Sequence, residues 1–283
     1  MNLRQVRTKI KSIGNVKKIT RAMQLVSAVK MKKAQISALE GRAYRDMLES
    51  IIVRISKKLN VSYSSLLSKP QIDVSRRLVI LVSSNKGLCG SFHSNLYREL
   101  LKHFPAEKTD FVTVGKKGAM FLGKSKALIL ADYSSLNPVV EVSSIFSFAI
   151  SQFLSQKYAE IYIYYNKFYS TFKSEVVAEK ILPISVPDEK KVYSHDGEYL
   201  IEPSPEELID PLLRSYVEDK LRNAVLSSQA VEHSLRMVSM KNATENATDV
   251  IYNLTLLGNK IRQSKITSEL LDMITAQESV EAA

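Results

Sequence analysis

Apolar residues recur every three or four positions over the first 58 residues of the chain. Leu3, Val6, Ile10 and Ile13 begin this stripe, and it continues, one position displaced, from residue 16 to residue 26. Steps of three and four place side chains on one face of a helix, so residues 2 to about 58 are predicted to form one long α-helix. At 1.5 Å per residue it would extend roughly 85 Å. So long a helix cannot bury its stripe against itself and needs a partner helix.

The helical period returns near the C-terminus, from Ser204 to about residue 278. Pro205 suits a first helical turn, whereas Pro211 is expected to kink or restart the helix. A few polar residues stand at or near the two stripes, which is typical of a seam that fixes register and weakens packing. These residues are Lys17, Thr20, Asn223 and Asn242. The two long helices are predicted to pack against each other as an antiparallel coiled coil.

Between the two helices, short apolar runs alternate with amphipathic stretches. Strands are expected at residues 77–83, 111–115, 127–131 and 160–166, and helices at residues 91–103, 116–123 and 142–156. This alternation is typical of a mainly parallel sheet covered on both faces. Two further runs, at residues 174–185 and 198–202, are expected to form an added antiparallel pair.

The predicted fold class is therefore α/β, with long N- and C-terminal helices in an antiparallel coiled coil and an inserted Rossmann-like α/β domain. A serine-rich stretch ending at Pro70 suggests the first boundary. The expected segments are an N-terminal coiled-coil helix over 1–60, a globular domain over 75–203, and a C-terminal coiled-coil helix over 204–283.

Positive charge is concentrated in the first segment. Residues 1–60 hold 15 Lys and Arg against three acidic residues, whereas the rest of the chain holds 25 basic and 26 acidic side chains. The net charge of +11 therefore belongs to the first helix, which needs an acidic partner: nucleic acid, anionic lipid or an acidic protein. No stretch reaches the ~18–20 apolar residues that span a bilayer, so direct membrane insertion is not expected.

The chain offers little catalytic chemistry. The loop at residues 85–91 follows a predicted strand, but it fits neither the P-loop nor the dinucleotide fingerprint, so nucleotide binding is not expected there. Cys89 has His93 four residues later but no evident orienting acid, and a small buried side chain is the favoured interpretation. One cysteine and four scattered histidines exclude an internal disulfide and argue against a metal cluster. No catalytic residue, cofactor or metal site is expected.

Two other function classes stay open from the residues alone. A basic coiled-coil protein that binds nucleic acid would need aromatic residues interleaved with the basic ones, and residues 1–43 contain no Phe, Tyr or Trp. An enzyme that uses the α/β insert is disfavoured by the missing site.

Four segments resemble the gamma subunit family of bacterial F-type ATP synthases from one end of the chain to the other. Residues 10–23 (IKSIGNVKKITRAM) and 26–35 (VSAVKMKKAQ) resemble its N-terminal signature, and residues 83–95 (SSNKGLCGSFHSN) resemble its second one. Residues 236–248 (RMVSMKNATENAT) and 259–270 (NKIRQSKITSEL) resemble its C-terminal signature. The sequence departs from the family pattern at Asn85-Lys86, Ser91, Lys265 and Ser268.

The resemblance implies a non-catalytic rotor stalk that couples ion flow to ATP synthesis and hydrolysis on the beta subunits. Its implied partners are the alpha, beta and epsilon subunits and the c ring, with one copy per complex and no nucleic acid. Its implied location is peripheral, on the cytoplasmic face of the bacterial cell membrane.

The resemblance also implies site residues. Contacts to the beta subunits, whose acidic loops would face the basic helix, are expected at Met23, Lys30, Lys33, Cys89, Arg262, Gln263 and Thr267. Tyr199, Leu200 and Ile201 correspond to the segment near the c ring and epsilon.

Overall fold

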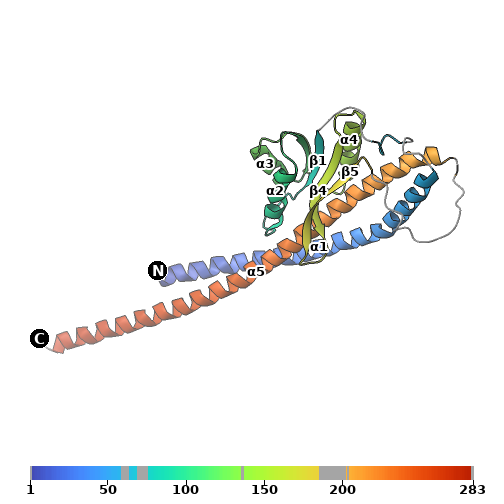
Figure 1. Ribbon diagram of the computed structural model, residues 1–283. Helices are drawn as coiled ribbons and strands as arrows, with labels where there is room; N and C mark the ends of the chain where they lie inside the picture. Colours follow the sequence, from blue (N-terminus) through green and yellow to red (C-terminus); the bar gives the residue numbers. More distant parts are fainter. Residues whose placement is uncertain are drawn as a thin grey trace. The chain divides into compact units, whose positions relative to one another are not determined.

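The computed structural model describes residues 2–58, 64–68, 76–134, 137–184, 202 and 204–281 (Figure 1). The chain divides into two compact units. One contains Met1–Ser27 and Met237–Ala283, and the other contains Ala28–Arg236. Two long helices, α1 (Leu3–Lys58) and α5 (Pro205–Glu281), contribute to both. The N-terminal helix therefore has the predicted length, and so does the C-terminal one.

The larger unit is built on a five-stranded sheet, and helices connect its parallel strands. Its strands are β1 (Arg77–Val82), β2 (Thr109–Val114), β3 (Ile129–Asp132), β4 (Glu160–Phe168) and β5 (Ser174–Leu182). Its connecting helices are α2 (Phe92–His103), α3 (Lys116–Lys124) and α4 (Val142–Leu154). The spatial order is β3-β2-β1-β4-β5. Strand β1 pairs in parallel with both β2 and β4, which confirms the predicted parallel sheet.

The predicted pairing of the last two strand runs is tested only in part. Strand β5 is antiparallel to a neighbour, as expected, and its partner among the described residues is β4, with Tyr164 opposite Ala178. Residues 198–201 lie outside the described residues, so pairing with that run stays a prediction. The short connection between β4 and β5 accounts for their pairing, because a hairpin brings consecutive strands together at a low cost in loop entropy.

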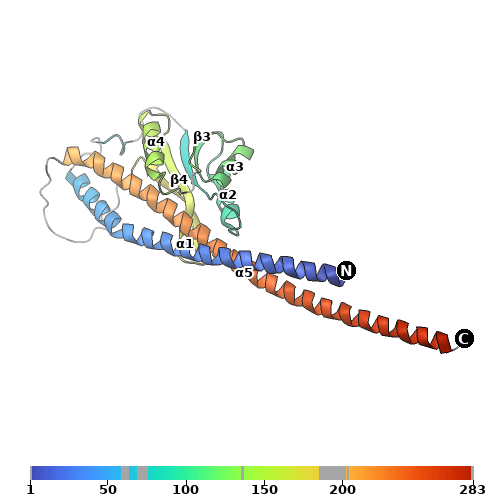
Figure 2. The same cartoon turned by 180° about the vertical axis from the view of Figure 1, so that it is seen from behind.

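Both faces of the sheet are buried, and β1 shows how. Its residues alternate between two apolar clusters: Leu78 and Ile80 face one cluster, and Val79 and Leu81 face the other. Helices α2 and α3 cover the second face, and α4 lies on the first (Figures 1 and 2). Period-two alternation with both faces apolar is why these strands read as continuous hydrophobic runs.

The two long helices also supply part of the core of the larger unit. Leu48, Ile52 and Ile55 of α1 are almost fully buried in the cluster that contains α4, as are Ile209 and Leu213 of α5. The β4–β5 hairpin is tied to α5 by hydrogen bonds of its backbone to two serine side chains. The globular core is thus made in part from the helix segments.

Within each unit, α1 and α5 run antiparallel. In the larger unit, Arg45 Nε donates to Asp219 Oδ2 at 2.8 Å. In the smaller unit, the hydroxyls of Thr20 and Thr244 lie 2.8 Å apart in a buried hydrogen bond. Thr20 therefore acts in the seam as predicted, whereas Asn242 is exposed to solvent.

Helix α5 does not restart at Pro211, which lies inside it. Proline removes one backbone hydrogen bond and disfavours a helix interior. Ile209 and Leu213 on either side are 1% and 0% exposed, and their burial outweighs the lost bond.

Candidate functional site

The loop after β1 occupies the position where open parallel sheets bind ligands. Strands β2 and β4 lie on opposite sides of β1, so the chain reverses its winding there. Ligands of such folds bind at the carboxyl ends of the strands beside this switch point. In this chain, residues 83–91 fill that place and carry the second signature.

The loop itself satisfies the first turn of α3. Ser83 Oγ accepts a hydrogen bond from Gly118 N at 2.9 Å, and Asn85 Oδ1 accepts one from Lys116 N at 3.0 Å. The carbonyl of Ser84 accepts the N–H of Lys117 at 3.0 Å. A phosphate at this helix start would need the same N–H groups. The arrangement is therefore that of a closed structural turn.

Arg236 of α5 holds the outer part of the loop. Its side chain is almost fully buried, and it donates to the carbonyls of Lys86 and Gly87, each at 3.2 Å. It also donates to Glu232 at 2.8 Å. Leu88, between these anchored residues and Cys89, has a φ of 62° and is 64% exposed. Sequence reasoning missed this role of Arg236, although its place in the C-terminal signature is a signal for it.

The polar groups around Arg236 have shifted pKa values. Burial raises the pKa of Glu232, although Arg236 opposes the effect. Burial lowers the pKa of His233 to about 4, helped by the positive charges of Arg236 and Lys30. His233 is therefore neutral at pH 7, and its Nδ1 accepts a hydrogen bond from Arg236 Nη1 at 3.2 Å.

Cys89 and His93 are adjacent but are not arranged as an activated pair. The Ser84 hydroxyl donates its hydrogen to the carbonyl of Lys86. In the 2.8 Å hydrogen bond between Ser84 Oγ and His93 Nε2, the donor is therefore the Nε2–H of the imidazole. Nδ1 is then an acceptor, and the Cys89 thiol lies 3.5 Å from it. Burial raises the pKa of Cys89 and lowers that of His93, so both are neutral at pH 7. A neutral buried thiol is a poor nucleophile. Among the described residues, no group of His, Cys, Asp and Glu is placed to hold a metal ion.

The residues expected to contact the beta subunits come from three segments of the chain. Met23 is half-buried on α1, and Lys30 and Lys33 are exposed on the same helix. Cys89 is buried beneath the loop, with 1% of its surface exposed. The last three, Arg262, Gln263 and Thr267, are exposed along the end of α5. Tyr199, Leu200 and Ile201 lie outside the described residues.

Exposed apolar side chains extend along the helix pair of the smaller unit. On α1, Val16, Ile19 and Leu25 are about half exposed, and on α5 Ile266 and Leu270 are exposed to a similar degree. A large amount of exposed apolar surface is typical of a protein-binding site. Val16, Ile19 and Val26 belong to the predicted apolar stripe but are 49%, 60% and 56% exposed, so the structure does not bury this part of the predicted seam.

No helix within the described ranges combines the length and the apolar character that crossing a bilayer requires.

Comparison with known proteins gives matches over nearly the whole chain. The family model described as ATP synthase matches residues 2–280. ATP synthase gamma chains from Akkermansia muciniphila and Clostridium perfringens are 35% and 38% identical to it, with 99% and 98% of both chains covered.

Solved structures agree with these matches. A chain of the Euglena gracilis mitochondrial ATP synthase superposes with a TM-score of 0.66 at 17% identity, covering 99% of this chain and 95% of the other, and so shares the fold. A chain of the Tetrahymena thermophila mitochondrial ATP synthase central stalk and c ring gives a TM-score of 0.58 at 25% identity, with 80% and 99% covered. These matches do not support the nucleic-acid-binding alternative. The chain belongs to the ATP synthase gamma chain family.

Proposed function

We propose that this chain is the central-stalk rotor subunit of a bacterial F-type ATP synthase. It couples ion flow through the c ring to ATP synthesis and hydrolysis on the beta subunits. The observation that carries the proposal is the full-length match to gamma chains, at up to 38% identity with 98% coverage. The antiparallel helix pair with exposed apolar and basic side chains supports it.

The proposed mechanism is a shift in the populations of beta-subunit conformations. The helix pair exposes both basic and apolar side chains, and in this proposal each rotor angle presents different ones to each of the three beta subunits. A contact that binds one conformation better than another favours it by that difference in free energy. In this proposal the chain performs no chemistry itself, which fits the neutral, closed Cys89–His93 pair.

The proposed partners are the alpha, beta and epsilon subunits and the c ring, with one copy of this chain per complex. The proposed location is peripheral, on the cytoplasmic face of the cell membrane. Contacts to beta subunits are assigned to Met23, Lys30, Lys33, Arg262, Gln263 and Thr267. Cys89 is buried, so we assign it an indirect role: it supports the loop, and exposed Leu88 beside it makes the contact with a beta subunit. Tyr199, Leu200 and Ile201 are assigned to the vicinity of epsilon and the c ring. The segments 1–60, 75–203 and 204–283 remain the proposed domain division.

The test is to reverse two charges in the assembled complex. Lys30→Glu with Lys33→Glu places negative charge where an acidic beta loop is expected, so the number of ions pumped per ATP hydrolysed should fall. Both side chains are exposed, so the effect should be modest and should weaken as salt rises. The matched control is Lys108→Glu with Lys157→Glu, which makes the same charge change on exposed lysines of the α/β part. Unchanged pumping and hydrolysis in the first variant, with normal assembly, would contradict the assignment.

A further inference from the structure

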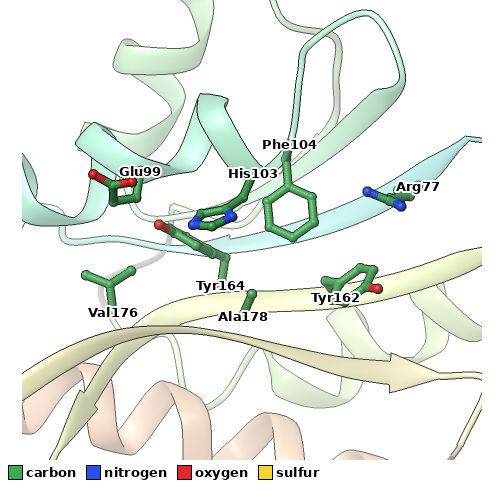
Figure 3. A pocket seen from close by; sticks show the side chains of 8 residues that line it. All are labelled: Arg77, Glu99, His103, Phe104, Tyr162, Tyr164, Val176 and Ala178. Atoms are coloured by element: carbon green, nitrogen blue, oxygen red, sulfur yellow. The ribbon is translucent and has the colours of Figure 1, made fainter.

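A cleft of about 350 Å³ opens beside the edge strand of the sheet, and no part of the proposed rotor function uses it. Its walls come from α2, β4 and β5 and from the start of β1 (Figure 3). Three aromatic rings line it: the ring of Phe104 lies 5.2 Å from that of Tyr162 and 5.9 Å from that of Tyr164, between centroids. Val176 and Ala178 of β5 add apolar surface. The volume falls in the range of small-molecule sites, about 300–1,000 Å³.

One end of the cleft carries a buried hydroxyl that lacks a partner. Tyr164 is 2% exposed, and no described residue gives its Oη a hydrogen bond. Figure 3 shows this hydroxyl at the same end as the side chains of Glu99 and His103. A buried hydroxyl without a partner destabilises a fold, and a bound ligand that pairs with it would remove that cost.

The electrostatic field at the Glu99 end of the cleft favours a positively charged ligand group. Burial and the Glu99 carboxylate together raise the pKa of Tyr164 to about 12, which keeps the phenol neutral. Lys102 pairs with Glu99 through Oε1 at 3.2 Å, and the Lys102 side chain is 68% exposed and that of Glu99 42% exposed, so this ion pair is weak. The faces of the aromatic rings also attract cations.

The other end of the cleft carries more positive than negative charge. Arg77, which lines it, has its Nε 3.5 Å from the carboxylate of Glu160, Lys180 Nζ lies 4.0 Å from the same carboxylate, and Tyr162 donates to it. A cationic group of a ligand is therefore favoured only at the Glu99 end, and the apolar part of the ligand is expected to face Arg77.

We propose that this cleft binds a compact organic cation, a primary ammonium or guanidinium group on an apolar stem. The N–H groups of the ligand donate to Glu99 and to Tyr164 Oη, and the stem packs on Phe104, Tyr162 and Val176. Glu99 supplies the charge preference and Tyr164 the orientation.

The test uses the purified full-length chain and three probes of nearly equal shape: phenethylamine, neutral 2-phenylethanol and anionic 3-phenylpropanoate. Binding is followed by NMR chemical-shift titration of backbone amides. Phenethylamine should bind saturably in the millimolar range and shift the amides of β5 around Val176 and Ala178. The alcohol should bind about fivefold more weakly, and the carboxylate more weakly still.

Two variants separate the contributions. Glu99→Gln and Tyr164→Phe should each weaken phenethylamine binding about fivefold. Tyr164→Phe should not lower the melting temperature, because it removes an unpaired hydroxyl, and Glu99→Gln changes a surface residue and should fold in any case. The controls Glu107→Gln and Tyr97→Phe, which lie outside the cleft lining, should leave binding unchanged. Equal affinity for amine and alcohol, no saturable shift near β5, or full affinity in both cleft variants would each overturn the proposal.

Discussion

Gly115 shows how closely the turn between β2 and α3 is fitted to the loop after β1. Its φ is 103°, which side-chain-bearing residues rarely adopt, and a Cβ there would lie 2.8 Å from three atoms of Ser83. Ser83 is itself fixed, because its hydroxyl donates a hydrogen bond shared by the carbonyl oxygens of residues 114 and 115 and accepts one from the N–H of Gly118. Neither partner can move away without breaking buried hydrogen bonds.

We therefore expect Gly115→Ala to lower the free energy of unfolding by about 2–4 kcal/mol, from backbone strain together with overpacking. The matched control is Gly123→Ala in α3, where a Cβ meets nothing within 4 Å. That change should be neutral or should stabilise the fold by about 0.5–1 kcal/mol. Urea unfolding of both variants measures the difference, and equal stability of the two would show that the turn relaxes.

His233 links the polar cluster around Arg236 to pH. Its pKa in the folded chain, about 4, lies below the value of 6.5 for a free histidine. Because the unfolded chain binds the proton more readily, the stability contributed by neutral His233 is fully present above pH 6.5. It is lost as the pH falls from 6.5 towards 4. Protonation would also remove the acceptor that Arg236 uses and place two positive charges together.

The melting temperature of the chain should consequently fall between pH 6.5 and pH 4, and His233→Gln should reduce that fall. Glutamine offers Arg236 a carbonyl oxygen and does not titrate. Partly buried His93 also has a lowered pKa, so part of the pH dependence should remain. His103→Gln, at an exposed position, is the control and should leave the slope unchanged. If the melting temperature of His233→Gln falls with pH as steeply as that of the wild type, the pH dependence comes from other groups.

At the scale of elements, the sequence predicted what depends on local periodicity. The helix over 2–58 and strand 77–83 were found within a few residues, because each is set by its own apolar spacing. The pairing of β5 with β4 was not predicted, since pairing depends on which strand edge is free in three dimensions. Arg236 was missed as an anchor for the same reason: its targets, the carbonyls of Lys86 and Gly87, lie about 150 positions earlier in the chain.

The contact between α1 and α5 in the larger unit is fixed by an ion pair that periodicity does not reveal. Arg45 and Asp219 are only 20% and 14% exposed, and their side chains meet at 2.8 Å. Removing one partner would leave the other charge poorly solvated. We expect Arg45→Ala or Asp219→Ala alone to cost about 1–3 kcal/mol, and the double variant to cost less than the sum of the two.

A double-mutant cycle by urea unfolding measures this coupling. The exposed pair on the same helix, Arg42 with Asp46 at 73% and 47% exposure, is the control. Arg42→Ala should change stability by less than about 0.5 kcal/mol. Strict additivity of the Arg45 and Asp219 variants would mean that the two charges do not interact.

At the scale of the whole molecule, burial is shared unequally between the two units. The larger unit contains two apolar clusters, to which the strands, the short helices and both long helices contribute side chains. In the smaller unit the buried apolar side chains are Val6, Met240 and Ala247, within the described residues. Helices that gain little from packing depend on intrinsic propensity, which is weak in water. The exposed apolar residues on the smaller unit are then the surface that the proposed hexamer would cover.

Hydrogen exchange along α5 tests this difference within one continuous helix. Residues 209–231 contribute side chains to the apolar clusters of the larger unit, whereas Ala247 is the one buried apolar side chain among residues 245–275 of the smaller unit. Both stretches have the same helical hydrogen bonds. In the isolated chain, amides of the second stretch should open by local unfolding and exchange at least about a hundredfold faster, because only global unfolding exposes the first. Residues 3–27 of α1 should follow the faster stretch, since they share its unit. Assembly with the alpha and beta subunits should slow both of these regions and leave residues 209–231 unchanged, because binding stabilises only the states it contacts. Equal protection along all of α5 in the free chain would show that the helix pair of the smaller unit is stable without a partner.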